Sequence, residues 1–262
     1  MIPMVEHLAM TWASIDALCS SLGEADWKEP TGCPGWSVQD NLSHLVDYEA
    51  FALGRPRPDH VVADLSHAKN AMGESNEVGV DARRARSGRE VLGEFREVTA
   101  ERLERLERLT EEELDRKTQT PVGPGTVRDL LTLRVMDTWS HEQDIRRALR
   151  RPGHTDGPVV AHSIGYFCGF LPYVVGKLAA APDGTTTVVL VGDLPPVAVE
   201  MTEGRGRLAA SVPDEPTVLL RTDVSNFAAL VGGRSDARPD DVDITGDTAL
   251  GRRIVASLGF MP

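Results

Sequence analysis

Apolar residues in the first 22 positions recur every three or four residues, which is the spacing of one face of an α-helix. The residues of this face are Val5, Leu8, Trp12, Ile15, Cys19 and Leu22. The pattern predicts an amphipathic first helix with its apolar face turned toward a core.

Two later segments begin with the same local signal for a helix start. Ser37 follows a Pro-Gly turn and has Asp40 three residues on, and Thr126 follows another Pro-Gly turn and has Asp129 three residues on. A hydroxyl residue followed at this spacing by an acid or amide can satisfy the unpaired backbone N–H groups at a helix start. Both segments are therefore predicted to be capped helices.

The second helix is expected over residues 37–53, a third over 89–109 and a fourth over 126–150. Between the second and the third, residues 54–88 are polar and interrupted by Pro and Gly, which predicts a long excursion with short helical pieces, of the kind that often covers a site. Four helices joined in this way favour a four-helix bundle.

The pattern changes in the second half of the chain. After a predicted helix over 159–179 come β-branched runs, followed by two closing helices. The strand-like runs are TTTVVLV, VAVEM, RLAAS and TVLLRT, and the closing helices are SNFAALVG and TALGRRIVASLG. We expect a helical domain over 1–155 and a smaller α+β domain over 156–262, with an antiparallel sheet if the short turns are hairpins.

Charge and composition narrow the classes of partner. The chain has 262 residues and a formal net charge of -12, without any Lys/Arg-rich run, which argues against nucleic acid and anionic lipid as partners. Three cysteines without close pairing favour a reduced, cytoplasmic protein, and the apolar stretch 159–181 carries too many polar residues for a membrane span. We expect a small-molecule substrate, and a monomer or homodimer that contacts neither nucleic acid nor membrane.

The inward face of the fourth helix is unusually polar. Its positions, at alternating three- and four-residue steps, are Val127, Leu130, Arg134, Asp137, His141, Asp144 and Ala148. Burying a polar group without a partner costs on the order of 2 to 7 kcal/mol, so these groups need partners. A bound metal ion would satisfy several of them at once.

Asp137 and His141 are four residues apart and so project side by side, and His44 on the second helix can supply a third ligand. Three nitrogen and carboxylate ligands leave coordination positions open, which is typical of a catalytic site. Asp47 and Asp144, each three residues beyond a histidine, are expected to hydrogen-bond those imidazoles. The alternative is that the Asp-x-x-x-His pair is an ordinary exposed or locally bonded pair.

Two longer motifs favour the metal interpretation. The segments GCPGWSVQDNLSHLVDYE and MDTWSHEQDIRRAL resemble the mycothiol-dependent maleylpyruvate isomerase family within the DinB-like metalloenzymes. SNFAALVGGR and DVDITGDTALGRRIVASLGF are similar to the sterol-carrier-like second domain of that family. The resemblance implies a DinB-like bundle with a divalent metal, zinc above all, on His44, Asp137 and His141. The family usually has Glu where this chain has Asp137, which leaves a different reaction open.

The resemblance also implies a reaction. Family members use mycothiol, a thiol of actinobacteria, as cofactor or cosubstrate, and a metal-bound thiolate would attack a small, anionic electrophile as a transferase or isomerase. A lysine-poor, arginine-rich composition, with Lys only at positions 28, 69, 117 and 177, agrees with an actinobacterial source. Arg234 is the candidate catalytic, substrate-binding residue, or else a basic residue at a helix C-terminus. Arg134 is a candidate for cofactor or anion binding, or else a partner of Asp137 or Asp144.

Other candidates are expected to be structural. Trp36 and Cys33 are predicted to pack against the bundle, and the remaining histidines lack a ligand-like partner at useful spacing. They are His7, His60, His67, His154 and His162. Two rival functions remain: a mycothiol-independent metalloenzyme of secondary metabolism, and a non-enzymatic protein that binds a small apolar ligand.

Overall fold

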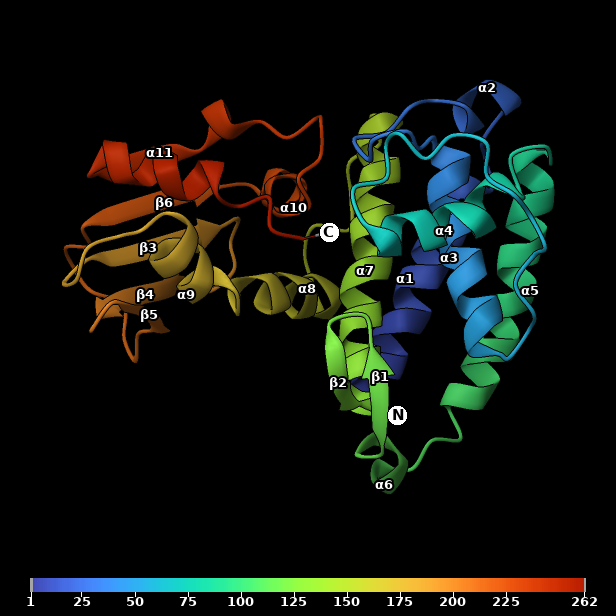
Figure 1. Cartoon of the computed structure of the whole chain (residues 1–262), viewed down its shortest axis with the longest axis horizontal. Coiled ribbons are helices and arrows are strands. Elements are labelled where there is room, and N and C mark those ends of the chain that lie inside the picture. The colour runs from blue at the N-terminus through green and yellow to red at the C-terminus, as the bar shows by residue number, and fades with distance from the viewer. Residues whose placement is uncertain (1, 262) are drawn as a thin grey trace. The chain divides into compact units, whose positions relative to one another are not determined.

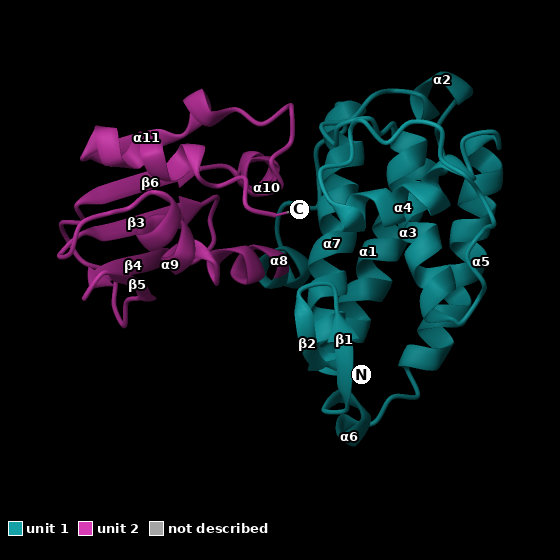
Figure 2. Cartoon of the chain, viewed as in Figure 1, with its two compact units in different colours: residues 1–162, 262 teal, residues 163–261 magenta. Residues whose placement is uncertain are grey.

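A computed structural model describes residues 2–261, which form two compact units, residues 2–162 and 163–261 (Figures 1 and 2). The first unit consists of α1 (Pro3–Cys19), α2 (Glu24–Trp27), α3 (Val38–Ala52), α4 (Ala71–Asp81), α5 (Gly88–Leu106), α6 (Glu111–Leu114), β1 (Lys117–Thr120), β2 (Gly123–Thr126), α7 (Val127–Ala148) and the first part of α8 (Pro158–Cys168).

Four long helices, α1, α3, α5 and α7, form the bundle of the first unit (Figure 1). α1 packs on α7 and α5, and α3 packs on α5 and α7. The apolar stripe predicted for α1 is buried, with Val5, Leu8 and Ile15 at 0–1% exposure. Burial of such stripes, more than intrinsic helix propensity, stabilises helices of this length.

Both predicted capped starts are confirmed. The Ser37 hydroxyl accepts from the Asp40 backbone N–H, and the Asp40 carboxylate accepts from the Ser37 backbone N–H. Thr126 and Asp129 make the same reciprocal pair at the start of α7. The caps therefore set where the two helices that carry the candidate site begin.

The polar excursion, where short helical pieces were predicted, contains an 11-residue helix, α4, which packs on α3. Gly73 and Gly79 interrupt its pattern, and its buried residues are Glu77, Gly79 and Val80, so the hydrophobic signal is weak. A short antiparallel hairpin, β1–β2, also precedes α7, where no strand was predicted.

The second unit is an α+β unit. It contains the rest of α8, then α9 (Leu171–Tyr173), the π-helix η1 (Val174–Leu178), β3 (Thr186–Val191), β4 (Val197–Thr202), β5 (Arg205–Leu208), β6 (Val218–Thr222), α10 (Val224–Val231), the 3₁₀-helix η2 (Pro239–Asp241), β7 (Asp243–Gly246) and α11 (Thr248–Ala256).

Its five strands form one sheet in the order β5-β4-β3-β6-β7. β5–β4, β4–β3 and β6–β7 are antiparallel, and the central pair β3–β6 is parallel, with Thr187 opposite Val218. The hairpins predicted from short turns are present between β3 and β4 and between β4 and β5. β6 instead follows a crossover connection and pairs in parallel with β3. The predicted fold class, a helical bundle followed by an α+β domain with an antiparallel sheet, is confirmed, except that one of the four strand pairings is parallel.

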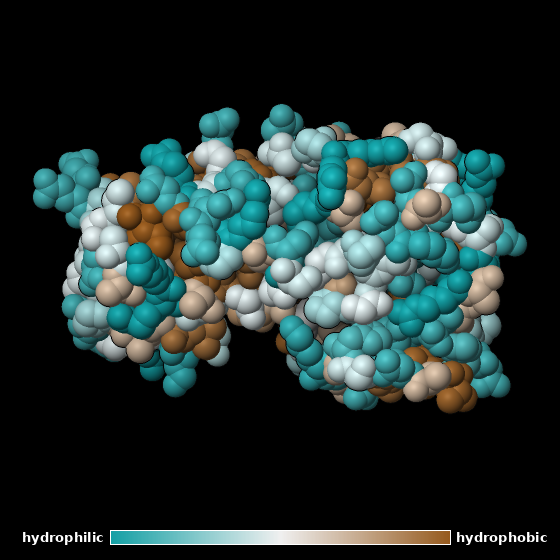
Figure 3. Space-filling view, turned by 90° about the horizontal axis from the view of Figure 1, so that it is seen from above, coloured by the Kyte–Doolittle hydropathy of each residue, from teal (hydrophilic) through white to brown (hydrophobic). Residues whose placement is uncertain are grey.

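One helical stretch among the described residues, Pro158–Leu178, is long and apolar enough to cross a membrane by length and composition alone. Half of its apolar window is buried inside the protein, and core helices meet the same criterion. On the face seen in Figure 3, hydrophilic residues predominate and hydrophobic ones form separate patches.

Candidate metal centre

Two helices of the bundle bring the three predicted ligands together. His44 comes from α3, and Asp137 and His141 come from α7. His44 Nε2 lies 3.5 Å from Asp137 Oδ2, and His141 Nε2 lies 3.7 Å from Asp137 Oδ1. The ligand atoms of the three residues all lie within 4.8 Å of one another, so one ion could contact all three.

The cluster is buried but reachable from solvent. The side chains of His44 and His141 are 8% exposed, whereas Asp137 is 26% exposed. Burial lowers the pKa of His44, which favours the neutral imidazole that a metal requires. The donor set, two imidazole nitrogens and one carboxylate, suits zinc and similar divalent ions.

His141 is oriented through its other ring nitrogen. Nδ1 lies 2.8 Å from Asn41 Oδ1 and 3.2 Å from Asp144 Oδ2, and both oxygens accept hydrogen bonds. In the neutral imidazole Nδ1 is therefore the nitrogen that carries the proton, and Nε2 is directed to the cluster. Burial by itself would lower the pKa of His141, but Asp144, Cys33 and Asp137 raise it to about 9.

Arg134 holds Asp137 in place. Its Nη1 pairs closely with Asp137 Oδ2, and its Nη2 lies 2.9 Å from Glu49 Oε1. The guanidinium also stacks on the Tyr48 ring at 3.6 Å and is only 3% exposed. Burial would raise the pKa of Asp137, yet the Arg134 charge and the His44 hydrogen bond hold it well below its usual range. These contacts favour the internal-partner alternative for Arg134 over cofactor binding.

The two predicted partners of the histidines behave differently. Asp144 contacts His141 as expected and is itself paired with Arg147. Asp47 faces α4 instead of His44 and pairs with Arg83 Nη1 at 3.2 Å and Arg57 Nη2 at 3.4 Å. The prediction for Asp47 was wrong because spacing along α3 does not reveal which neighbouring helix a side chain meets.

Sequence reasoning assigned no site role to three residues that the structure places beside the ligands. Asn41 lies one turn before His44 on α3 and could have been found from that spacing. Cys33 forms a second ligand-type group with His141 and Asp144, with ligand atoms within 4.8 Å. The Trp36 ring lies 5.2 Å from the His44 ring and 5.7 Å from the His141 ring. Cys33 and Trp36 lie in a loop, where no period indicates direction.

Arg234 belongs to the second unit, just after α10. Its Nη1 donates to the Gly232 carbonyl at 2.9 Å, at the C-terminus of the helix. A basic group is favourable there, so the local geometry accounts for the residue without a substrate. Its predicted catalytic role stays a prediction.

The protein thus consists of a helical bundle followed by a unit with a mixed β-sheet. The bundle contains a candidate metal site formed by two histidines and an aspartate. The chain belongs to the mycothiol maleylpyruvate isomerase family: the family model for the N-terminal domain matches residues 8–146, and that for the C-terminal domain matches residues 161–253. The resemblance seen in the motifs is thereby confirmed.

Individual relatives are distant. Uncharacterized proteins from Mycobacterium tuberculosis strains H37Rv and CDC 1551 are each 26% identical over 251 residues, which covers 94% of this chain and 91% of theirs. Crystal structures of the mycothiol-dependent maleylpyruvate isomerase and of a mutant of it superpose with TM-scores of 0.51 and 0.54. Each is 16% identical and covers 92% of this chain and 91% of its own, so the likeness is one of fold.

Proposed function

We propose that this protein is a metal- and mycothiol-dependent isomerase or transferase that acts on a small, anionic electrophile in the cytoplasm. The observation that carries the proposal is the convergence of His44, Asp137 and His141 in the part of the chain that the N-terminal family model matches. The names of the family and of its solved members supply the thiol and the class of substrate.

The ligands would be His44, Asp137 and His141, with a divalent ion such as zinc. When bound, the ion would supply positive charge that lowers the pKa of a thiol ligand, which makes the thiol a better nucleophile near neutral pH. Arg134 orients Asp137, and Asn41 with Asp144 keeps His141 in the tautomer that presents Nε2. Because the pKa of His141 is raised to about 9 without metal, binding at Nε2 requires loss of a proton.

Metal content is the first test. Protein purified from metal-replete medium should contain close to one divalent ion per chain. His44→Ala should lose it, while His60→Ala, a histidine paired with Asp81 outside the cluster, should keep it. A folded, metal-free wild-type protein would contradict the ligand assignment.

Thiol dependence is the second test. Calorimetric titration should show binding of mycothiol to the metal-loaded protein and little binding of an unrelated thiol such as glutathione. Maleylpyruvate, the substrate named for the solved relatives, should be isomerised only with mycothiol present. Undiminished turnover without thiol would favour the mycothiol-independent metalloenzyme, and metal without any turnover would favour the ligand-binding protein.

We further propose that Arg234 recognises the substrate anion, since a guanidinium can bind a carboxylate with two parallel hydrogen bonds. Arg234→Ala should raise KM far more than it changes mycothiol affinity. Arg238→Ala is the matched control, because this arginine of the same unit is 59% exposed and paired with Asp223 and Asp241. An equal effect of both variants would remove Arg234 from the site.

A further inference from the structure

The loop before α3 places an aromatic ring against both candidate ligand histidines. The Trp36 ring centroid lies 5.2 Å from that of His44 and 5.7 Å from that of His141, at tilts of 39° and 35°. The two imidazoles lie 4.8 Å apart. These are contact distances for aromatic pairs, so the indole limits how far either imidazole can rotate.

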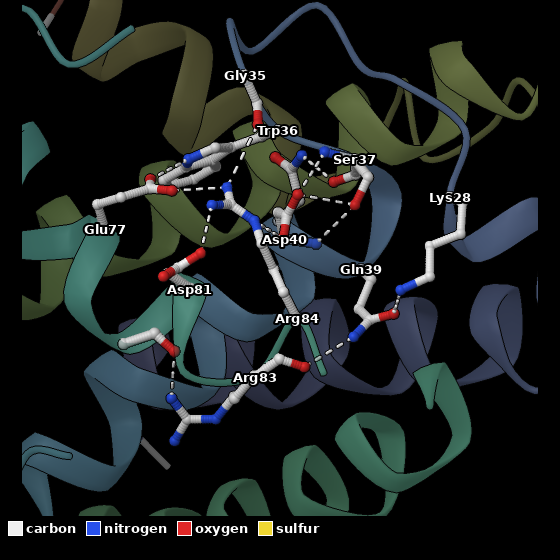
Figure 4. Close-up of polar contacts among 12 residues, drawn as sticks. Lys28, Gly35, Trp36, Ser37, Gln39, Asp40, Glu77, Asp81, Arg83 and Arg84 are labelled. Carbon is white, nitrogen blue, oxygen red and sulfur yellow. Dashed lines mark hydrogen bonds and ion pairs between the residues drawn. The ribbon is translucent and has the colours of Figure 1, made fainter. Parts of the chain in front are cut away.

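The ring is itself held by a buried acid on a different element. Trp36 Nε1 donates to Glu77 Oε2 at 2.8 Å, and Glu77, on α4, is 1% exposed (Figure 4). Glu77 also lies 2.6 Å from Arg84 Nη2 and 3.0 Å from His67 Nε2. A buried carboxylate with three partners has little freedom to move, so it is a firm anchor for the indole.

Two arginines just after α4, and Gly79 within it, make further contacts with α3. Arg84 Nε lies 3.1 Å from Asp40 Oδ1 (Figure 4). Arg83 Nη1 lies 3.2 Å from Asp47 Oδ1. Gly79 lies so close to Asp47 that a Cβ there would overlap the carboxylate. The chain of contacts therefore runs from α3 through α4 and Glu77 to Trp36 and back to the histidines.

We propose that Trp36 and Glu77 are positioning residues of the metal centre: Trp36 restrains the His44 and His141 rings, and Glu77 restrains Trp36. The inference rests on the ligand assignment in the proposed function. On this inference the segment 54–88 contributes Glu77, the acid that helps to fix the geometry of the metal ligands. Groups that orient metal-binding histidines typically affect metal affinity by 10- to 100-fold.

The test is a double-variant cycle on the full-length protein, read out by Zn²⁺ affinity and by the visible absorption spectrum of the Co²⁺ form. Trp36→Phe keeps a ring but removes the N–H donor, and Glu77→Leu removes the acceptor at similar volume. Each should weaken Zn²⁺ binding by about 10-fold and alter the Co²⁺ spectrum. The double variant should be no weaker than the weaker single variant, because both changes break one link.

Glu74→Leu, an exposed acid on the same helix, is the matched control and should leave both readouts unchanged. If Glu77→Leu does not fold, Glu77→Gln replaces it. This variant keeps a hydrogen-bond acceptor for the indole, so with Trp36 unchanged it should bind Zn²⁺ with wild-type affinity. The inference would be overturned if the folded Trp36→Phe variant had the Zn²⁺ affinity and the Co²⁺ spectrum of the wild type. It would also be overturned if the double variant lost as much Zn²⁺ binding free energy as the two single variants together. Neither of these results would contradict the proposed function. A wild-type protein that binds no metal would contradict both the proposed function and the positioning role of Trp36 and Glu77.

Discussion

Replacement of Arg134 by Met tests whether the buried ion pairs hold the bundle together. The guanidinium is 3% exposed, contacts Glu49 Oε1 through Nη2 at 2.9 Å and pairs with Asp137. Without it, Arg102 Nε, at 3.3 Å, is the one cationic partner left to the buried Glu49 within residues 2–261. Removing one partner of a buried pair typically costs about 3 to 5 kcal/mol, because the other charge is left without compensation in a poorly solvated place.

An exposed pair supplies the comparison. Arg96 Nε lies 2.5 Å from Asp16 Oδ1, but the two side chains are 52% and 39% exposed. Such pairs contribute about 0 to 1 kcal/mol, so Arg96→Met should cost far less than Arg134→Met, although the Arg96–Asp16 contact is shorter than the Arg134–Glu49 contact. The double variant Arg134→Met/Glu49→Gln should recover at least about 1 kcal/mol relative to the sum of the single variants, since it leaves no bare charge at Glu49.

Urea unfolding followed by tryptophan fluorescence, with chelator present to remove metal, measures these differences. The four tryptophans all belong to the first unit, so the signal reports that unit alone. They are Trp12, Trp27, Trp36 and Trp139. A loss of unfolding free energy in Arg134→Met no larger than that in Arg96→Met would refute the reasoning.

Three further outcomes are expected. His44→Ala should abolish metal binding yet leave the far-ultraviolet circular dichroism almost unchanged, because apolar stripes and not the ion pack the helices; a collapse of helix content would contradict this. Asp137→Glu should retain more metal than Asp137→Ala, and equal loss in both would remove Asp137 from the ligands. Burial raises the pKa values of Cys19 and Cys168 to about 12, so at pH 8 iodoacetamide should label only the partly exposed Cys33 in the native protein. Mass spectrometry after brief labelling checks this, with urea-unfolded protein as the three-site control.

Local signals in the sequence predicted the helices that carry the candidate site. The capping pairs at Ser37 and Thr126 act within four residues, and the step of four from Asp137 to His141 puts both side chains on one helix face. These features depend on residues at most four positions apart in the sequence, which is why they could be predicted without a structure.

Features that depend on contacts between distant segments could not be read in the same way. Glu77 reaches Trp36 across 41 positions, and β6 pairs with β3 in a parallel register that no hairpin implies. Asp47 was assigned to His44 because both lie on one helix, but it pairs with Arg83, which the packing of α4 on α3 brings close. The two motifs that contain His44, Asp137 and His141 predicted the candidate ligands, but the residues that contact these side chains also come from a loop, and the acid that holds Trp36 comes from a helix with little hydrophobic pattern.

The close packing of α4 on α3 at Gly79 limits how the protein can be stabilised by redesign. Alanine in place of a helical glycine usually gains about 0.5 to 1 kcal/mol through helix propensity, and Gly93 on α5, where an added methyl group would have no neighbour within 4 Å, is open to that gain. At Gly79 the same methyl group would push on the Asp47 carboxylate and separate two helices. Consensus design that treats helical glycines alike would thus strengthen the bundle at one position and loosen the packing beside the candidate metal ligands at the other.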